Sequence, residues 1–339
     1  MTRSRYLGLL RKLGVIAITL FGLLTMTFII GRLMPIDPVL AVVGPDADSS
    51  TYEQVFREMG LDRPVWVQYQ YYLQAMLSGD FGRAILTGSP VVDDILRVLP
   101  ATIELATVAI LVGVGLGIPL GVYAATHRGR LGDHLTRLIT LFGYSTPVFW
   151  VGMVGLIVFY AWLNWAGAAG RIGFAYDGMF ESYTGFYLID TLLSGNLEAF
   201  FSALRHIALP ALILGLNSVS FLGRMTRSFM LEQLSQEYIK TARVKGLSER
   251  SVIWKHAFKN IRVQLLTIVA LAYGGLLEGA VLIETVFAWP GFGQYLTDSL
   301  LMGDMNAVMA SVLFIGLVFV FLNLLSDVLY TLFDPRTRS

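Results

Sequence analysis

The chain has 339 residues, of which 55% are hydrophobic and 14% charged, with a formal net charge of +1 and a mean hydropathy of +0.65. This composition excludes an ordinary soluble globular protein, in which about 25% of the residues are charged. The sequence contains no cysteine and only four scattered histidines, so disulfide frameworks and thiolate metal sites are excluded and no metal site is predicted.

Six stretches are long and apolar enough to predict transmembrane helices, because crossing a bilayer takes about 20 mostly apolar residues. Four of them contain long runs without any charged side chain, whereas one is short and another contains Glu278 and Glu284. The predicted spans cover residues 13–31, 101–126, 138–162, 206–223, 263–287 and 305–333. The first run is too long for a cleaved signal peptide, so we expect it to remain as the first span. The expected fold class is therefore an all-α membrane protein.

The distribution of basic residues predicts the orientation of these spans. With residues 1–12 placed inside the cell, the inner segments contain 18 Lys and Arg residues and the outer segments contain 7. Cytoplasmic loops carry such an excess of basic residues. We therefore expect a multi-pass protein of the cell's inner (plasma) membrane with both termini in the cytoplasm.

Two outer segments are long enough to contain structure of their own. Residues 32–100 form the predicted external cap, in which residues 65–76 have helix-like apolar spacing with tyrosines suited to a membrane interface. In the second outer segment, residues 171–205, the stretch 197–204 indicates an amphipathic helix before the fourth span.

The inner segment 224–262 is too polar for a span and too regularly patterned for a disordered linker. Residues 237–245 predict a helix with four side chains on one face, at i, i+3, i+4 and i+7, namely Tyr238, Thr241, Ala242 and Lys245. Gly246 is expected to end this helix, and Ser248 to cap a second helix that runs into the fifth span. The pattern indicates a docking site for a partner; the alternative is a basic loop held by anionic lipid headgroups.

Several motifs then give the chain a family resemblance. The run Glu237-Tyr-Ile-Lys-Thr-Ala-Arg-Val-Lys-Gly246 resembles the EAA loop of the inner-membrane permease subunits of binding-protein-dependent ABC importers, specifically the B-type subunits of dipeptide, oligopeptide and nickel systems. Further motifs in the family order include Leu99-Pro-Ala-Thr-Ile-Glu104 and Glu284-Thr-Val-Phe-Ala-Trp-Pro-Gly-Phe-Gly293. One departure is Gln264, which stands where many members have a proline, so the entry of the following helix is expected to be straighter.

The resemblance implies the type I ABC importer permease fold, with six spans, an external cap between spans 1 and 2, and a core of five spans over residues 101–339 that includes the coupling loop 224–262. It implies that this loop couples the permease to an ATPase through Glu237, Tyr238, Thr241, Ala242, Lys245 and Gly246. The implied partners are a homologous second permease, two cytoplasmic ATP-binding subunits and an extracytoplasmic substrate-binding protein, in addition to membrane lipid. No nucleic acid partner is expected.

The chain itself is expected to have no catalytic residues and no cofactor. It contains no Gly-Lys dipeptide and hence no Walker-type phosphate loop, so ATP and Mg are expected to bind to the partner ATPase subunits. The chain is therefore predicted to be a transporter subunit and not an enzyme.

The translocation path is expected to be lined by polar residues within spans, because such groups face protein or water. The candidates are Asn217, Ser220 and Glu278, with a helix–helix hydrogen bond as the alternative for Glu278. For Glu284 near the outer end of its span a structural pairing is favoured, and for Glu104 simple snorkelling or capping at a span end.

The family resemblance implies peptides as substrates, with nickel chelates or another small solute as the alternative. The lack of cysteine and of histidine within a span argues against a path for bare nickel. A different class of protein, an ATP-independent secondary transporter with Glu278 as proton relay, is the remaining alternative.

Overall fold

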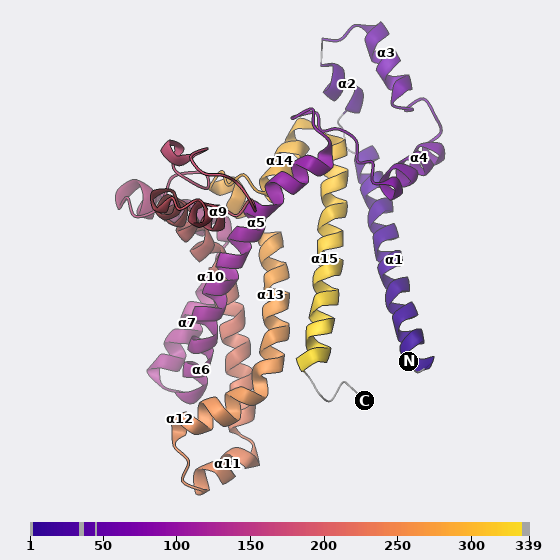
Figure 1. The fold of residues 1–339 in the computed structure, drawn as a ribbon. Coiled ribbons are helices and arrows are strands. Elements are labelled where there is room, and N and C mark those ends of the chain that lie inside the picture. Colours follow the sequence, from indigo (N-terminus) through magenta and orange to yellow (C-terminus); the bar gives the residue numbers. More distant parts are fainter. Residues whose placement is uncertain (1–2, 34–36, 45, 334–339) are drawn as a thin grey trace. The chain divides into compact units, whose positions relative to one another are not determined.

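The computed structural model describes residues 3–33, 37–44 and 46–333, and most of these residues are helical (Figure 1). They contain no β-strand beyond an isolated antiparallel bridge between Arg83 and Pro90. The chain divides into two compact units, the first comprising Met1–Val98 and Tyr295–Phe321, the second Leu99–Gln294 and Leu322–Ser339. The borders fall inside helices α5, α14 and α15, whose bounds are given below.

The first unit begins with the long helix α1 (Arg3–Leu33) and continues through short helices of the external segment. These are α2 (Pro38–Val43), α3 (Ser49–Glu58) and α4 (Val65–Ser78). Asp37 caps α2 by accepting a hydrogen bond from the Val39 amide at 2.9 Å, and Asp48 caps α3 by accepting from the Thr51 amide at 3.1 Å. Helix α4 (Val65–Ser78) confirms the helix that was predicted at residues 65–76.

Helix α4 packs on the first span within the first unit. Phe28 and Tyr72 are buried together with Leu24 and Leu313, and the Thr25 and Tyr69 hydroxyls lie 2.6 Å apart. Burying aromatic rings against apolar side chains contributes about 25 cal/mol per Å² of apolar surface. The external segment is therefore a folded part of this unit and not a loose loop.

The second unit is built around two long helices, α10 (Leu197–Leu234) and the continuous run Glu249–Val286, which comprises α12 (Glu249–Ser251), a π-helical stretch (Val252–Ala257) and α13 (Phe258–Val286). The other elements around these two helices are, in chain order, α5 (Val91–Val112), a π-helical stretch (Gly113–Gly117), α6 (Ile118–Thr126), α7 (Leu131–Ser145), α8 (Val148–Gly155), a π-helical stretch (Leu156–Trp162), a 3₁₀ turn (Phe174–Tyr176), α9 (Tyr187–Leu193) and α11 (Glu237–Val244). Helices α14 (Phe292–Met302) and α15 (Met305–Phe333) complete the chain.

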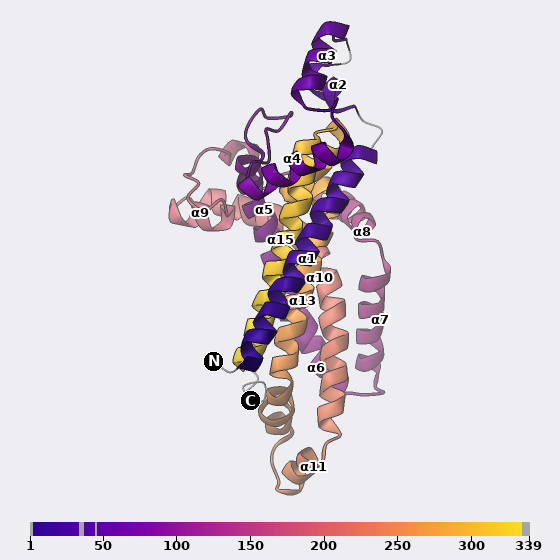
Figure 2. The ribbon, with the colours of Figure 1, turned by 90° about the vertical axis from the view of Figure 1, so that its right-hand side faces the viewer.

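Glycine permits the closest helix contacts around α10. A Cβ atom added to Gly121 of α6 would lie 2.6 Å from the Gly223 carbonyl oxygen of α10, and one added to Gly143 of α7 would lie 2.4 Å from Ser220 Oγ. Larger residues at these positions would push the helices apart, so the glycines allow α6 and α7 to pack directly on α10. Figure 2 shows α7 alongside α10.

Within the described residues, five helices are long and apolar enough to cross a membrane, or six if a bent pair is taken as one span. The bent pair consists of α7 and α8, which meet at 99°. The predicted span 138–162 thus falls on this bent pair, and its helix is broken at Thr146–Pro147. Pro147 explains the break, because it disfavours the helical conformation of the residue before it, and Thr146 is extended with ψ 131°.

Some predicted spans are shorter than the helices that contain them, whereas the predicted span 305–333 coincides with α15. The expected span 206–223 lies in the middle of the 38-residue helix α10, which also absorbs the amphipathic stretch 197–204. Residues 224–234 contain no glycine or proline, so the helix continues beyond the apolar run. The predicted loop 224–262 is correspondingly reduced to residues 235–248 between two long helices.

Candidate functional site

Helix α11 lies at one end of the second unit, in the loop between α10 and α12 (Figure 1). It ends as predicted at Gly246, which adopts a left-handed φ of +78°. The Gly246 amide donates to the Arg243 carbonyl at 2.9 Å and the Leu247 amide donates to the Ala242 carbonyl at 3.2 Å. This pair of hydrogen bonds is a Schellman motif, which favours glycine at the left-handed position. Ser248 then caps the next helix through the Ser251 amide, also as predicted.

Buried side chains hold α11 against the rest of the unit. Ile239 is fully buried and Ala242 is 6% exposed, and both belong to the same apolar core as α10 and α13. The Tyr238 hydroxyl donates to Gln233 Oε1 of α10 and accepts from Asn260 Nδ2 of α13, each at 2.9 Å. Tyr238 therefore joins the two long helices, and α11 is a rigid element rather than a mobile loop.

Arg243 adds a further connection from α11 to the following helix. Its guanidinium donates to both carboxylate oxygens of Glu249, at 2.8 and 3.3 Å. Since both side chains are largely exposed, this ion pair is worth well under about 1 kcal/mol. Its role is to fix the direction of the turn at residues 245–248.

Of the face that the spacing predicted, Tyr238, Thr241 and Lys245 are exposed and only Ala242 is buried. Glu237, Thr241 and Val244 are exposed at i, i+4 and i+7, and Val244 is 88% exposed. Lys245 and Gly246 are also exposed, whereas Ala242 points into the chain's own core. Sequence reasoning missed Val244, because which apolar residue of a short amphipathic helix is buried depends on how the helix is tilted against its neighbours.

Of the polar residues expected along a path, Asn217 lines a cavity between α10 and α13. The cavity has a volume of about 240 Å³, and its wall includes Phe221 of α10 and Gly275 and Gly279 of α13. Glu278 is exposed on α13, on the same helix face as Leu271 and Gly275, at i+7 and i+3 from them. Asn217 and the stretch of α13 that carries Glu278 are thus near one another.

Ser220, the third residue predicted to line the path, does not line the Asn217 cavity. It is 1% exposed and lies at the contact between α10 and α7, where its Oγ faces Gly143. Ser220 and Asn217 are three residues apart on the helix, and the structure directs them to different neighbours. The small size of Ser220 serves the close packing of α7.

The two sequence motifs around Thr102 and Glu284 are brought together in the second unit. Glu284 is fully buried, accepts a hydrogen bond from the Thr102 hydroxyl at 2.5 Å and another from the Gln294 amide at 3.0 Å. The Thr102 hydroxyl in turn accepts from the Phe292 amide at 2.8 Å, and the Trp289 indole donates to the Ala101 carbonyl at 3.0 Å. The expected structural pairing of Glu284 is confirmed.

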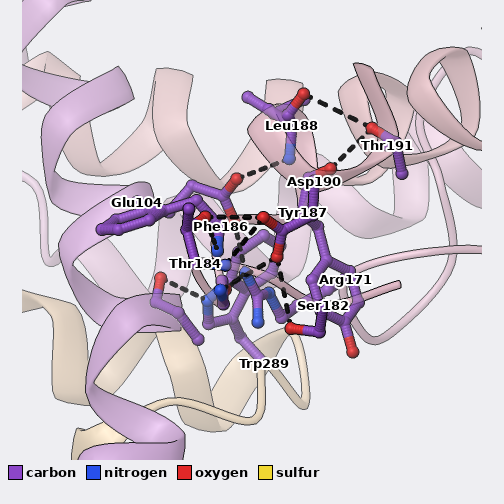
Figure 3. A network of polar contacts seen from close by, with 12 residues as sticks. Glu104, Arg171, Ser182, Thr184, Phe186, Tyr187, Leu188, Asp190, Thr191 and Trp289 are labelled. Atoms are coloured by element: carbon purple, nitrogen blue, oxygen red, sulfur yellow. Dashed lines mark hydrogen bonds and ion pairs between the residues drawn. The ribbon is translucent and has the colours of Figure 1, made fainter. Parts of the chain in front are cut away.

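Glu104, two residues beyond Thr102 on α5, anchors the second external segment (Figure 3). Its carboxylate pairs with Arg171 at 2.6 Å and accepts from the Leu188 amide at 2.8 Å. Arg171 also donates to the Gly185 carbonyl at 2.7 Å, and its guanidinium lies 3.7 Å from the centroid of the Tyr187 ring. Both ionic side chains are almost fully buried. The expectation that Glu104 snorkels at a span end is therefore wrong.

Asp190 completes this arrangement by holding the loop before α9. Its buried carboxylate accepts hydrogen bonds from the Thr184 amide, the Thr184 hydroxyl and the Gly185 amide, at 2.9, 2.7 and 2.9 Å (Figure 3). Buried charges are stable only when they are paired in this way. Residues 171–190 are consequently fixed to α5 by a network of polar contacts.

Taken together, these features define a polytopic helical membrane protein with a rigid helix at one end of its second unit and a polar network at the other. Comparisons with known proteins identify the class further. The family described as "Binding-protein-dependent transport system inner membrane component" matches residues 117–339, and its N-terminal region matches residues 5–106. The chain belongs to this family of inner-membrane transport components.

Curated relatives match nearly the whole chain. The di/tripeptide transport system permease protein DppB of Pseudomonas aeruginosa is 40% identical over 329 residues, covering 97% of each chain. The probable D,D-dipeptide transport system permease protein DdpB of Escherichia coli is 42% identical over 315 residues, covering 93% of this chain and 92% of the relative.

A solved structure supports the fold. The MetNI methionine ABC transporter in an inward-facing conformation aligns with a TM-score of 0.52 at 17% identity, covering 71% of this chain and 96% of the matched chain. The fold is thus that of an ABC importer permease, as the resemblance implied.

Proposed function

We propose that this chain is the permease subunit of an ATP-driven, binding-protein-dependent importer of dipeptides and oligopeptides. Two similar proteins that are 40% and 42% identical over almost their full length are named as peptide or dipeptide permeases, which supports this substrate class. The chain would form half of the translocation path, and a homologous second permease the other half.

The observation that carries the proposed mechanism is the anchored helix α11 with its exposed face. Val244 is a large apolar side chain at 88% exposure, flanked by the exposed Glu237 and Thr241. Protein–protein interfaces have an apolar centre within a polar rim, and Val244 among these polar residues fits that arrangement. We assign this face, with Lys245 and Gly246 at its end, as the contact with one of two cytoplasmic ATP-binding subunits.

Within this assignment the predicted coupling residues divide into two groups. Glu237, Thr241, Lys245 and Gly246 are exposed for contact with the ATPase, whereas Tyr238 and Ala242 position α11 against α10 and α13. ATP and Mg would bind to the partner subunits, since the chain contains no Gly-Lys dipeptide. Closure of the ATPases would then shift the permease between inward-open and outward-open arrangements.

The path and orientation follow from the same proposal. The Asn217 cavity between α10 and α13, together with the exposed Glu278, is our candidate for this chain's part of the translocation path. The excess of basic residues in the inner segments supports a cytoplasmic location for α11 and both termini. An extracytoplasmic binding protein would deliver the peptide from the opposite side.

The experiment that tests the coupling assignment replaces Val244 with glutamate. Introducing a charge into an apolar contact should weaken it by about 2–4 kcal/mol, which is a loss of 30-fold or more in affinity for the ATPase. The assay is co-purification of the ATPase subunits with the tagged permease, followed by peptide-stimulated ATP hydrolysis in the presence of the binding protein.

The matched control is Leu193→Glu, which places the same charge at an exposed leucine of α9. In Figure 1, α9 and α11 lie at opposite ends of the second unit. The control should retain the ATPases. Equal retention by the two variants would reject α11 as the coupling surface, and a permease that imports peptide without any ATPase would reject the proposed function altogether.

A further inference from the structure

A cavity lined by basic side chains lies between α7 and α10. It has a volume of about 540 Å³, and its basic lining consists of His134 and Arg137 from α7 and Arg224 and Arg227 from α10. Its other walls are formed by Leu138, Thr140 and Leu141. None of these residues belongs to the coupling helix or to the Asn217 cavity.

The positive charge of this cavity is only partly neutralised. Asp133 is buried and pairs with Arg227 through two hydrogen bonds, at 2.7 and 2.9 Å. Arg137 and Arg224 are exposed and form no ion pair with an acidic side chain of the described residues. Two guanidinium groups are therefore available to an anion.

The walls of the cavity are rigid. Thr140 lies against Gly223 of α10, where an added Cβ atom would be 3.3 Å from Thr140 Cγ2, and Gly143 faces Ser220 one turn further along. The Arg224 guanidinium lies 4.3 Å from the centroid of the Tyr144 ring, which orients it by a cation–π contact. The two free arginines are thus presented from two helices that are fixed to each other.

Along α7 the lining changes from basic to apolar, just as a lipid molecule changes from a charged headgroup to apolar acyl chains. His134, Arg137, Leu138 and Leu141 lie on one helix face at i, i+3, i+4 and i+7, so the basic residues come first and the leucines follow over about 10 Å. The basic end adjoins the α6–α7 loop, at the same end of the second unit as α11 (Figure 2). Leu138 and Leu141 are about 60% exposed and lie toward the middle of the apolar helix pair.

We propose that this cavity binds the headgroup of an anionic phospholipid, with the phosphate between Arg137 and Arg224 and an acyl chain along Leu138 and Leu141. A soluble anion would use the arginines but not the exposed leucines, whereas a lipid uses both. Basic pockets between membrane helices recognise anionic headgroups in this manner. The proposal needs only that the second unit lies in a membrane; in the proposed orientation, the lipid belongs to the cytoplasmic leaflet.

The test is native mass spectrometry of the full chain in detergent, titrated with dioleoyl-phosphatidylglycerol and, separately, with dioleoyl-phosphatidylcholine. The wild type should retain the anionic lipid preferentially. In the double variant Arg137→Gln/Arg224→Gln, this preference should fall by about 30-fold, because each basic residue near the membrane contributes about 1 kcal/mol.

Two further variants separate a site from general charge. Arg250→Gln/Lys259→Gln removes two exposed cations from the α12–α13 region outside the cavity and should leave the preference unchanged. Arg137→Lys/Arg224→Lys keeps both charges and should retain most of the preference, which also shows that the fold tolerates changes at these positions.

The proposal is overturned if the glutamine double variant binds phosphatidylglycerol as well as the wild type does. It is also overturned if the Arg250/Lys259 variant loses the preference to the same extent, since the effect would then reflect net charge. Displacement of the bound lipid by millimolar inorganic phosphate alone would identify a soluble anion, and not a lipid, as the occupant. None of these outcomes depends on peptide transport or on the ATPases.

Discussion

The buried pair Glu104–Arg171 provides the sharpest test of how the second unit holds its external segment. Replacing Arg171 with methionine keeps much of the apolar length but removes the ion pair, the hydrogen bond to the Gly185 carbonyl and the cation–π contact with Tyr187. The Glu104 carboxylate would then stay buried beside α9 without its cation. Removing one partner of a buried pair costs about 3–5 kcal/mol, because an uncompensated charge is left behind.

The measurement is the midpoint of thermal unfolding of the purified full chain in one detergent at one heating rate, because such unfolding is often irreversible. A loss of this size lowers the midpoint by roughly 10 °C in a domain of 150–250 residues. The matched control is Arg57→Met, which breaks an ion pair with Glu53 whose side chains are more than two-thirds exposed. An exposed pair contributes at most about 1 kcal/mol, so the control should shift the midpoint by no more than about 3 °C.

A double-mutant cycle completes the test. Glu104→Gln removes the charge but keeps an oxygen that can accept from the Leu188 amide. If the pair is coupled, the double variant Glu104→Gln/Arg171→Met should be more stable than the sum of the two single effects predicts, by about 1–3 kcal/mol. If the effects of the two substitutions on stability simply add, or if the Arg171→Met variant is as stable as the wild type, this network does not stabilise the external segment.

Two further predictions concern the coupling helix and the orientation. Gly246→Ala should accelerate hydrogen exchange of the amides at residues 237–247 by about 5–30-fold, because an alanine in the left-handed conformation costs about 1–2 kcal/mol and no atom lies close enough to cause a clash. The control, Gly22→Ala, lies at an open helical position and should leave exchange at residues 237–247 unchanged. Unchanged exchange in Gly246→Ala would contradict the Schellman geometry. Because the chain lacks cysteine, a single cysteine introduced by Lys245→Cys or Ser194→Cys can be labelled without background from the chain itself. A membrane-impermeant maleimide should label Ser194→Cys in intact spheroplasts and Lys245→Cys only after lysis. The reverse pattern would contradict the proposed orientation.

The sequence was most informative where the physical signal is local. Apolar runs located the spans, and the Gly246–Ser248 pair located the turn after α11, because bilayer thickness and backbone conformation act on neighbouring residues. The break at Thr146–Pro147 carried a local signal as well, but the charge-free run around it predicted a span without locating the break. Helix ends beyond the apolar runs, such as residues 224–234 of α10, follow from the absence of breakers and not from hydropathy.

Contacts between distant residues could not be predicted in this way. Glu104 and Arg171 are separated by 67 positions, and nothing in the spacing of either residue names the other. The same holds for the burial of Ala242 and the exposure of Val244, which depend on the packing of α11 against α10 and α13. The family resemblance supplied the approximate location of the proposed coupling site, and the tertiary structure supplied its exposed face.

The lengths of the helices around α11 bear directly on the proposed coupling. Only residues 235–248 separate α10 from the helical run that begins at Glu249, and both helices continue without interruption by a loop into the apolar region. Asn217 lies 17 residues before the end of α10, which corresponds to about 25 Å along the helix. Tyr238 binds α10 and α13 at the α11 end, and the Asn217 cavity is walled by the same two helices. A displacement of α11 by an ATPase would therefore act on both walls of the cavity at once, through helices rather than through flexible connections.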